Sequence, residues 1–183
     1  MSLQEKIMIP PCLVDSDQIS DSPGPYCMSF GFDPELYSRS IKKIGLVNTP
    51  LLIKNRSGYM DVISGYRRIQ AVKALGWSRT PCRILPESTL PALEYLLLNL
   101  YENLSTRVFN SVEKGMILKH LVEHLKEGEV IKNYMPLLGL PSHEETLRFY
   151  IRIEEELDVE IKSRLALGGL TLQAAKMLLD VAP

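Results

Sequence analysis

The strongest constraint on the fold is a change in the residue pattern near Pro91. Before this point, short alternating segments such as Leu51–Lys54 and Tyr59–Ile63 predict strands, and the turn residues Asn55–Gly58 between them predict a hairpin. After this point, leucine and isoleucine recur with the helical period to the end of the sequence. The pattern therefore predicts an α+β fold, with a small mixed N-terminal domain followed by an all-α domain.

The length of 183 residues allows two small domains, which we place at residues 1–100 and 101–183. A hydrophobic fraction of 45% and a charged fraction of 23% exclude a disordered chain. Four further elements are expected in the first domain. They are a strand near Cys12–Val14, a helix between Asp33 and Gly45 with an apolar face of Leu36, Ile41 and Ile44, a helix over Tyr66–Leu75, and a strand over Thr80–Leu85.

The second domain contains several helix start and stop signals. Asn110 and Glu113 have the spacing of a capping box, and the helix that they open is expected to run to Gly128. Ser142 with Glu145 predicts a second capping box. A last pair of helices is separated by Gly168–Gly169, with Thr171 as the next N-cap.

Charge and cysteine content limit the class of protein. The net charge is −1, but the segment Arg39–Arg83 contains ten basic residues and one acid, Asp61, which favours a phosphate-bearing ligand. The three cysteines have no metal-ligand spacing, so we expect buried thiols in a reducing cytoplasm. No apolar run approaches 18 residues, so no membrane association is expected.

The segment Ser64–Gly65–Tyr66–Arg67–Arg68 is the first candidate site. It follows a predicted strand and opens a predicted helix, where backbone N–H groups carry partial positive charge and bind anions. Gly65 allows close approach of a phosphate, and arginine can hold its oxygens in a bidentate way. Two arginines in a first helical turn oppose the helix dipole, which indicates a function; surface ion pairs are the alternative.

Several segments in this order resemble the N-terminal domain of the ParB family of DNA-partitioning proteins. The similar segments are Ser40–Leu46, Pro50–Ile53, Val62–Arg68, Ala71–Gly76 and Pro81. The resemblance implies a ParB/sulfiredoxin-like domain that binds CTP or a related nucleotide with Mg²⁺, with Gly65, Arg67 and Arg68 near the triphosphate. Tyr66 replaces the glutamate usual in that family, and the cysteine that sulfiredoxins carry there, so sulfiredoxin activity is rejected.

A second candidate site lies between Tyr101 and Glu113. Glu102 and Asn103, followed by Thr106 and Arg107, resemble the glutamate–asparagine box of the same family. A carboxylate and an amide oxygen suit Mg²⁺ that bridges phosphates. The resemblance implies that Glu102 and Asn103 hold the metal and that Thr106 and Arg107 lie near the phosphate; a solvated helix end is the alternative.

The third candidate site is a helix-turn-helix motif. A short apolar helix over Val130–Leu138, the turn Gly139–Pro141 and a second helix have its outline. The N-terminal part of such a second helix reads bases in the major groove. The candidate DNA-binding residues are Ser142, His143, Thr146 and Arg148, with Glu144 as a possible acceptor from cytosine.

The charges of this segment leave alternatives open. Seven acids and two arginines lie between Pro141 and Ile161, although DNA affinity depends largely on cations, and Glu154–Glu156 is interpreted as a solvated face or a partner surface. Our hypothesis is a cytoplasmic, nucleoid-associated, homodimeric DNA-binding protein for partitioning or transcription control, with a partition ATPase or another protein as a further partner. A ParB-like nuclease or phosphodiesterase, and an adaptor without nucleotide binding, are the rivals. At most a weak nucleoside triphosphatase is expected, and the sequence end just after a helical pattern suggests a fragment without its dimerisation segment.

Overall fold

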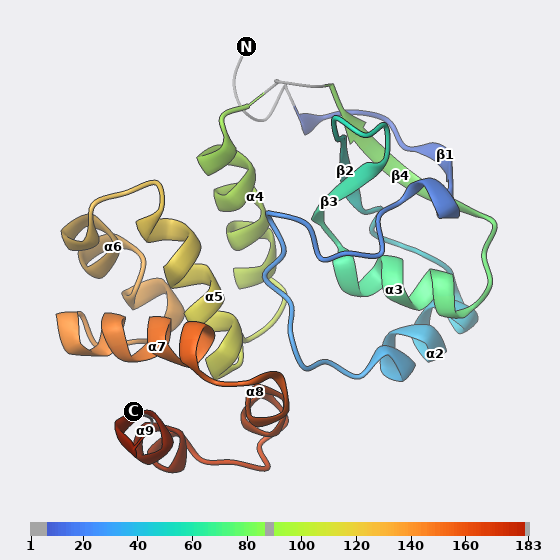
Figure 1. Cartoon of the computed structure of the whole chain (residues 1–183). Coiled ribbons are helices and arrows are strands. Elements are labelled where there is room, and N and C mark those ends of the chain that lie inside the picture. Colours follow the sequence, from blue (N-terminus) through green and yellow to red (C-terminus); the bar gives the residue numbers. More distant parts are fainter. Residues whose placement is uncertain (1–6, 87–89, 182–183) are drawn as a thin grey trace. The chain divides into compact units, whose positions relative to one another are not determined.

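The computed structural model of the chain describes residues 7–86 and 90–181. The chain forms two compact units, shown in Figure 1. We call Met1–Ser29 with Asp33–Asn99 the N-terminal unit, and Phe30–Phe32 with Leu100–Pro183 the C-terminal unit. The predicted fold class is confirmed, because the first unit contains a four-stranded sheet with helices and the second is helical.

The N-terminal unit is built on a mixed sheet with the strand order β1-β4-β2-β3. The strands are β1 (Cys12–Asp15), β2 (Leu51–Lys54), β3 (Met60–Ser64) and β4 (Arg79–Leu85). The pairs β1–β4 and β2–β3 are antiparallel, whereas β2 and β4 are parallel. The hairpin predicted around Asn55–Gly58 is confirmed, and its second strand begins one residue later than expected.

Helices cover both faces of this sheet. On one face, α3 (Tyr66–Ala74) buries Ile69 against Leu52 and Val62, and a short 3-10 helix η1 (Ser16–Gln18) follows β1. On the other face, the first part of α4 (Ala92–Leu104) buries Tyr95 in a cluster with Ile53. Beyond α3 lies α2 (Pro34–Ile44), as Figure 1 shows. The turn from β3 into α3 is therefore positioned by the packing of α3 between the sheet and α2.

The apolar face predicted for α2 is wrong. Leu36 and Ile44 are 62% and 64% exposed, whereas Ile41 is buried against Ala71 and Val72 of α3, with Tyr37 packed beside them. Residues at i and i+4 share a helix face, so Tyr37 and Ile41 form the buried stripe and leave Leu36 on the outer side. The predicted ends are confirmed, since Asp33 caps the Glu35 N–H and Gly45 ends the helix.

The C-terminal unit is organised around α5 (Ser111–Val122), which packs against α6 (Glu127–Asn133), α7 (Glu144–Glu156) and α8 (Val159–Ala166). A 3-10 turn η2 (Pro136–Leu138) joins α6 to α7, and α9 (Leu172–Val181) packs on α7. The Asn110–Glu113 capping box and the Thr171 cap are confirmed. No helix in the described ranges is long and apolar enough to cross a membrane.

Two helix boundaries in this unit were predicted wrongly. The helix opened by Asn110 ends at Val122 rather than at Gly128, and Gly128 lies in the first turn of α6. The second capping box does not form: the N-cap of α7 is His143, without a side-chain cap, and Ser142 lies outside the helix. Acidic side chains at Glu144 and Glu145 supply favourable charge to the first turn of α7 instead.

The expectation of three buried thiols is also wrong for one cysteine. Cys12 is exposed on β1, whereas Cys27 and Cys82 are buried. Burial raises the pKa of the Cys82 thiol to about 12. All three cysteines are free, as the absence of a disulfide pattern predicted.

Candidate functional site

The Ser64–Arg68 segment forms a tight turn between β3 and α3. Gly65 is the N-cap of α3 and has φ 96° and ψ 21°, in the left-handed region that side chains other than glycine rarely adopt. A Cβ atom at this position would lie 3.0 Å from the Pro50 Cβ and 3.1 Å from the Pro50 Cα. The backbone of this turn therefore approaches the start of β2 so closely that only glycine fits without displacement.

The first turn of α3 contains no acidic residue. Arg67 and Arg68 lie in this turn, and each is held by a contact within the N-terminal unit: Arg67 Nη1 donates to the Tyr37 hydroxyl at 3.2 Å, and Arg68 Nη1 donates to the Asn48 carbonyl at 2.8 Å. A helix start with two guanidinium groups and no acidic residue in its first turn is suited to bind an anion.

Tyr66 does not supply an acid or a nucleophile to this turn. Its ring packs on the core cluster around Leu52 and Val62, and its hydroxyl donates to the Asp21 carbonyl at 3.2 Å. Burial, with smaller contributions from Cys27 and Asp21, raises the pKa of the Tyr66 phenol. The side chain therefore stays neutral and anchors the first turn of α3 to the loop between η1 and α2.

The second predicted cluster lies entirely in the C-terminal unit. It includes Glu113, which sequence analysis did not assign to this site. Arg107 Nε donates to Asn103 Oδ1 at 2.6 Å, and Arg107 Nη1 donates to Glu113 Oε2 at 2.6 Å. The guanidinium also lies 4.4 Å from the centre of the Phe109 ring. The structure thus brings Asn103 and Arg107 together, and Thr106 joins them through hydrogen bonds of its hydroxyl to the Glu102 and Asn103 carbonyls.

Glu113 is the centre of this cluster and is fully buried. Its carboxylate accepts from Arg107, from the Asn110 N–H at 3.1 Å and from the Phe30 N–H at 3.1 Å. Sequence analysis assigned Glu113 to a capping box only. Its pairing with Arg107 could have been suspected from an arginine six residues before a capping glutamate, whereas the contact with Phe30, 83 residues away, has no local signal.

The segment Phe30–Phe32 is seated in the C-terminal unit by the same group of contacts. Asn110 Nδ2 donates to the Phe30 carbonyl at 2.9 Å. A Cβ atom on Gly31 would lie 2.4 Å from the Ala166 Cβ, so this segment passes directly over α8. A few residues from the N-terminal third of the chain are therefore part of the helical unit.

The third predicted cluster lies at the start of α7. Ser142, His143 and Thr146 are at or near the N-terminal end of this helix, and α6, η2 and α7 have the order of a helix-turn-helix motif. Gly139 turns the chain with φ 66°. Arg148 is exposed, but it forms an ion pair with Glu144 one turn earlier on the helix. The cation that would meet a phosphate is therefore partly neutralised by its own helix.

The acidic run Glu154–Glu156 is not an uncompensated acidic face. Glu154 pairs with Lys162 at 3.2 Å, Glu155 with Lys119 at 3.3 Å and Glu156 with Arg152 at 2.8 Å. The hydrogen bond with Arg152 lowers the pKa of Glu156. The pairs of Glu154 and Glu155 link α7 to α8 and α5, the pair of Glu156 lies within α7, and all three reduce the negative potential available to a partner protein.

The fold and these clusters define a class of chain: a mixed unit with a glycine–arginine turn at a helix start, followed by a helical unit with a helix-turn-helix outline. No family model matches the chain. The nucleoid occlusion protein of Halalkalibacterium halodurans is 28% identical over 89 residues, which are 49% of this chain and only 30% of that protein.

Two solved structures are similar over most of the chain. Both are of the C-terminally truncated chromosome-partitioning protein ParB from Caulobacter crescentus. Its complex with CTP-γ-S has 22% identity and a TM-score of 0.45, and covers 94% of this chain and 93% of that one. Its complex with the centromeric parS site has 22% identity and a TM-score of 0.48, and covers 93% and 86%.

Proposed function

We propose that this chain is a ParB-type DNA-binding protein of chromosome or plasmid partitioning, nucleoid occlusion or related transcription control, in which a bound nucleotide gates protein contacts. The observation that carries the proposal is the Gly65 turn. A left-handed glycine at the N-cap of α3, closed against Pro50 and followed by two arginines without an acid, fits a phosphate group. The nucleoid occlusion relative and the CTP-γ-S and parS complexes of ParB support the same reading.

The residues of the turn fit the triphosphate of CTP or a related nucleotide. Gly65 admits a phosphate oxygen to the backbone, and Arg67 and Arg68 place two guanidinium groups in the first turn of α3. Glu102 and Asn103, in the C-terminal unit, are the proposed ligands of Mg²⁺. Asn103 Oδ1 already accepts from Arg107, so Asn103 would exchange this partner on binding metal.

DNA is the proposed partner of the α6–η2–α7 segment. Ser142, His143, Thr146 and Arg148 are the proposed base- and phosphate-contacting residues, because the start of the second helix of such a motif enters the major groove. A homodimer would bind two half-sites, and a partition ATPase or another protein is a further proposed partner. A ParB-like nuclease or phosphodiesterase is the alternative function.

Replacement of Arg67 by alanine should strongly weaken nucleotide binding at the Gly65 turn. Removing one bidentate guanidinium from a phosphate site costs a charge-assisted contact of about 1.5–3 kcal/mol, which is roughly a 10- to 150-fold loss of affinity. Calorimetric titration with each of the four ribonucleoside triphosphates and Mg²⁺ measures this change. Arg79→Ala is the control, because Arg79 is exposed in the same unit and pairs with Asp15.

The titration of the unmodified chain and of the two variants has three informative results. Binding of one nucleotide by the unmodified chain, lost in the Arg67 variant and kept in the Arg79 variant, supports the nucleotide switch. Unchanged affinity in the Arg67 variant rules out the site. No binding of any nucleotide, with or without mixed DNA fragments, would favour the adaptor alternative instead.

Replacement of Glu144 by glutamine should increase DNA affinity. The change removes one negative charge from the proposed recognition helix and releases Arg148 from its ion pair. We expect about a three- to tenfold gain at low salt and a salt slope steeper by about one, as for one added phosphate contact. Fluorescence anisotropy with mixed-sequence duplex DNA at two salt concentrations measures both quantities.

Glu160→Gln is the matched control, because it removes the same charge from α8 outside the proposed recognition helix. An equal gain in the two variants would mean that only the net charge of the chain matters. No gain in the Glu144 variant would show that α7 does not approach phosphates.

A further inference from the structure

A cavity of about 370 Å³ lies in the N-terminal unit beside the β2–β3 hairpin, away from the Gly65 turn. The hairpin contributes Ile53, Lys54, Asn55, Arg56 and Asp61 to its lining. The loop before α2 and the start of α4 contribute an aromatic wall of Tyr26 and Tyr95. Gly65 lies at the opposite end of β3 from this hairpin turn, so the two sites are separate.

The aromatic wall is fixed in position. The Tyr26 and Tyr95 rings pack at a centroid distance of 5.3 Å and an angle of 52°. Tyr95 is buried, and its hydroxyl accepts from the Leu90 N–H at 3.1 Å. Asn99 Nδ2 donates to the Tyr26 carbonyl at 2.5 Å. Tyr26 therefore offers a supported ring surface on which a flat ligand can stack.

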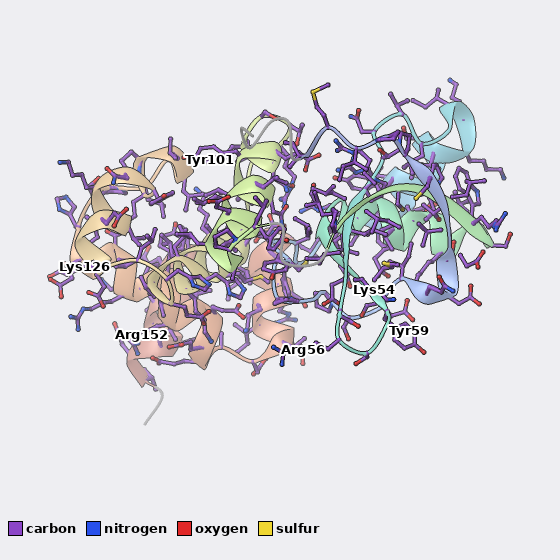
Figure 2. The ribbon with its side chains drawn as sticks, turned by 90° about the horizontal axis from the view of Figure 1, so that it is seen from above. Lys54, Arg56, Tyr59, Tyr101, Lys126 and Arg152 are labelled. Atoms are coloured by element: carbon purple, nitrogen blue, oxygen red, sulfur yellow. The ribbon has the colours of Figure 1, made fainter. Side chains whose placement is uncertain are left out.

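The polar part of the lining is also held in place. Asn55 Oδ1 accepts from the Ser57 and Tyr59 N–H groups, at 3.0 and 3.1 Å, and Asn55 Nδ2 donates to Asp61 Oδ1 at 2.9 Å. These bonds set the hairpin turn from which Lys54 and Arg56 project, labelled in Figure 2. The turn is thus ordered before any ligand arrives.

Lys54 and Arg56 differ from three exposed arginines of the chain. The exposed arginines Arg39, Arg79 and Arg148 each pair with a carboxylate. Neither Lys54 nor Arg56 forms an ion pair with any residue in 7–86 or 90–181. The hairpin therefore presents two unneutralised cations beside an aromatic wall, with the exposed ring of Tyr59 in the same turn.

We propose that this cavity is a second binding site for a nucleotide unit, a flat base with an attached phosphate, taken either as a free nucleoside monophosphate or from single-stranded DNA. The base would stack on Tyr26, the phosphate would meet Arg56 and Lys54, and Asp61 would accept from an N–H of the base or a sugar hydroxyl. A cavity of this volume lies at the lower end of the range for small-ligand sites, which suits one nucleotide. Stacking of bases on aromatic side chains beside a basic groove is a usual way of binding single strands.

The test uses the full chain with the Gly65 site disabled by Arg67→Ala. Thymidine monophosphate and a twelve-residue oligothymidylate are the two probes, titrated by calorimetry and by ¹H–¹⁵N NMR. In this background, Lys54→Gln with Arg56→Gln should weaken binding at least tenfold, while Lys42→Gln with Lys43→Gln, an equal charge loss on α2, should change it less than threefold. Tyr26→Leu, which keeps apolar bulk and removes most of the stacking surface, should also weaken binding, with Trp77 fluorescence as the folding control.

The results distinguish a free nucleotide from single-stranded DNA as the ligand, and they also test whether the cavity binds either one. Binding of the monophosphate with no gain for the oligonucleotide identifies a free nucleotide, whereas tighter binding of the oligonucleotide, lost in the hairpin variant, identifies single-stranded DNA. Equal weakening by the hairpin and α2 variants, or NMR shifts that leave Asn55 and Tyr95 unmoved, overturns the proposal. Because the Gly65 site is already disabled in this background, failure here leaves the proposed nucleotide switch intact.

Discussion

Replacing Glu113 with alanine should lower the free energy of unfolding of the C-terminal unit by about 3–5 kcal/mol, because the change leaves the buried guanidinium of Arg107 without its counter-charge. The Arg107 side chain is only 13% exposed and that of Glu113 only 1%. The same change removes the acceptor of the Phe30 and Asn110 N–H groups. Urea unfolding followed by far-ultraviolet circular dichroism measures the loss, since the helices dominate that signal.

Two controls separate the buried charge from a simple truncation. Glu123→Ala removes a carboxylate from the exposed end of α5 and should cost less than about 0.5 kcal/mol. Glu113→Ala combined with Arg107→Leu should be more stable than Glu113→Ala alone, because the double variant has no isolated buried cation. A loss below about 1 kcal/mol in the single variant would contradict a buried ion pair at this position.

Replacing Gly65 with alanine should destabilise the N-terminal unit by about 2–5 kcal/mol and abolish anion binding at the turn. A left-handed backbone costs an alanine about 1–2 kcal/mol, and a Cβ forced against Pro50 adds about 1–3 kcal/mol. Trp77, the single tryptophan, lies in this unit, so its fluorescence during urea unfolding reports the change.

Gly76→Ala is a matched control for the cost of placing an alanine in a left-handed backbone conformation. Gly76 follows the same helix at its other end and has φ 72°, but a Cβ there would meet no atom within 4 Å. The Gly76 variant should therefore show only the backbone cost, and the difference between the two variants measures the closeness of Pro50. Equal losses would mean that the Gly65 turn relaxes freely and is not closed against β2.

Much of the fold could be predicted because its signals are local. The hairpin at Asn55–Gly58 and the caps at Asp33, Asn110 and Thr171 depend on residues within a few positions of one another. The change from mixed to helical pattern near Pro91 gave the fold class for the same reason. The Gly65 turn was also recognisable, since a glycine between a strand and two arginines is a local feature.

The errors have a common physical origin in long-range packing. Leu36 and Ile44 have apolar character, but contacts with α3 select the neighbouring stripe that contains Ile41. Ser142 has the composition of a cap, but His143 occupies the N-cap position of α7, without a side-chain hydrogen bond. Cys12 is apolar in character but lies on the edge strand β1, which is paired on one side only within the sheet.

The candidate sites were predicted as residue sets, and those assignments remain predictions. Sequence analysis did not identify the residues that pair with the candidate arginines. The pairing of Arg148 with Glu144 follows helical spacing and was within reach. The pairing of Arg107 with Glu113 also had a local signal, whereas the contact of Glu113 with Phe30, 83 residues away, had none.

The position of Phe30–Phe32 over α8 has a consequence for truncated and chimaeric forms of this protein. The helical unit is discontinuous in sequence, because three of its residues lie before the β2–β3 hairpin. A gene segment that encodes only residues 100–183 would yield helices whose Asn110 and Glu113 lack Phe30 as a partner. The two units are therefore not interchangeable modules, and a chimaera that swaps the helical part would need to carry the Phe30–Phe32 segment with it.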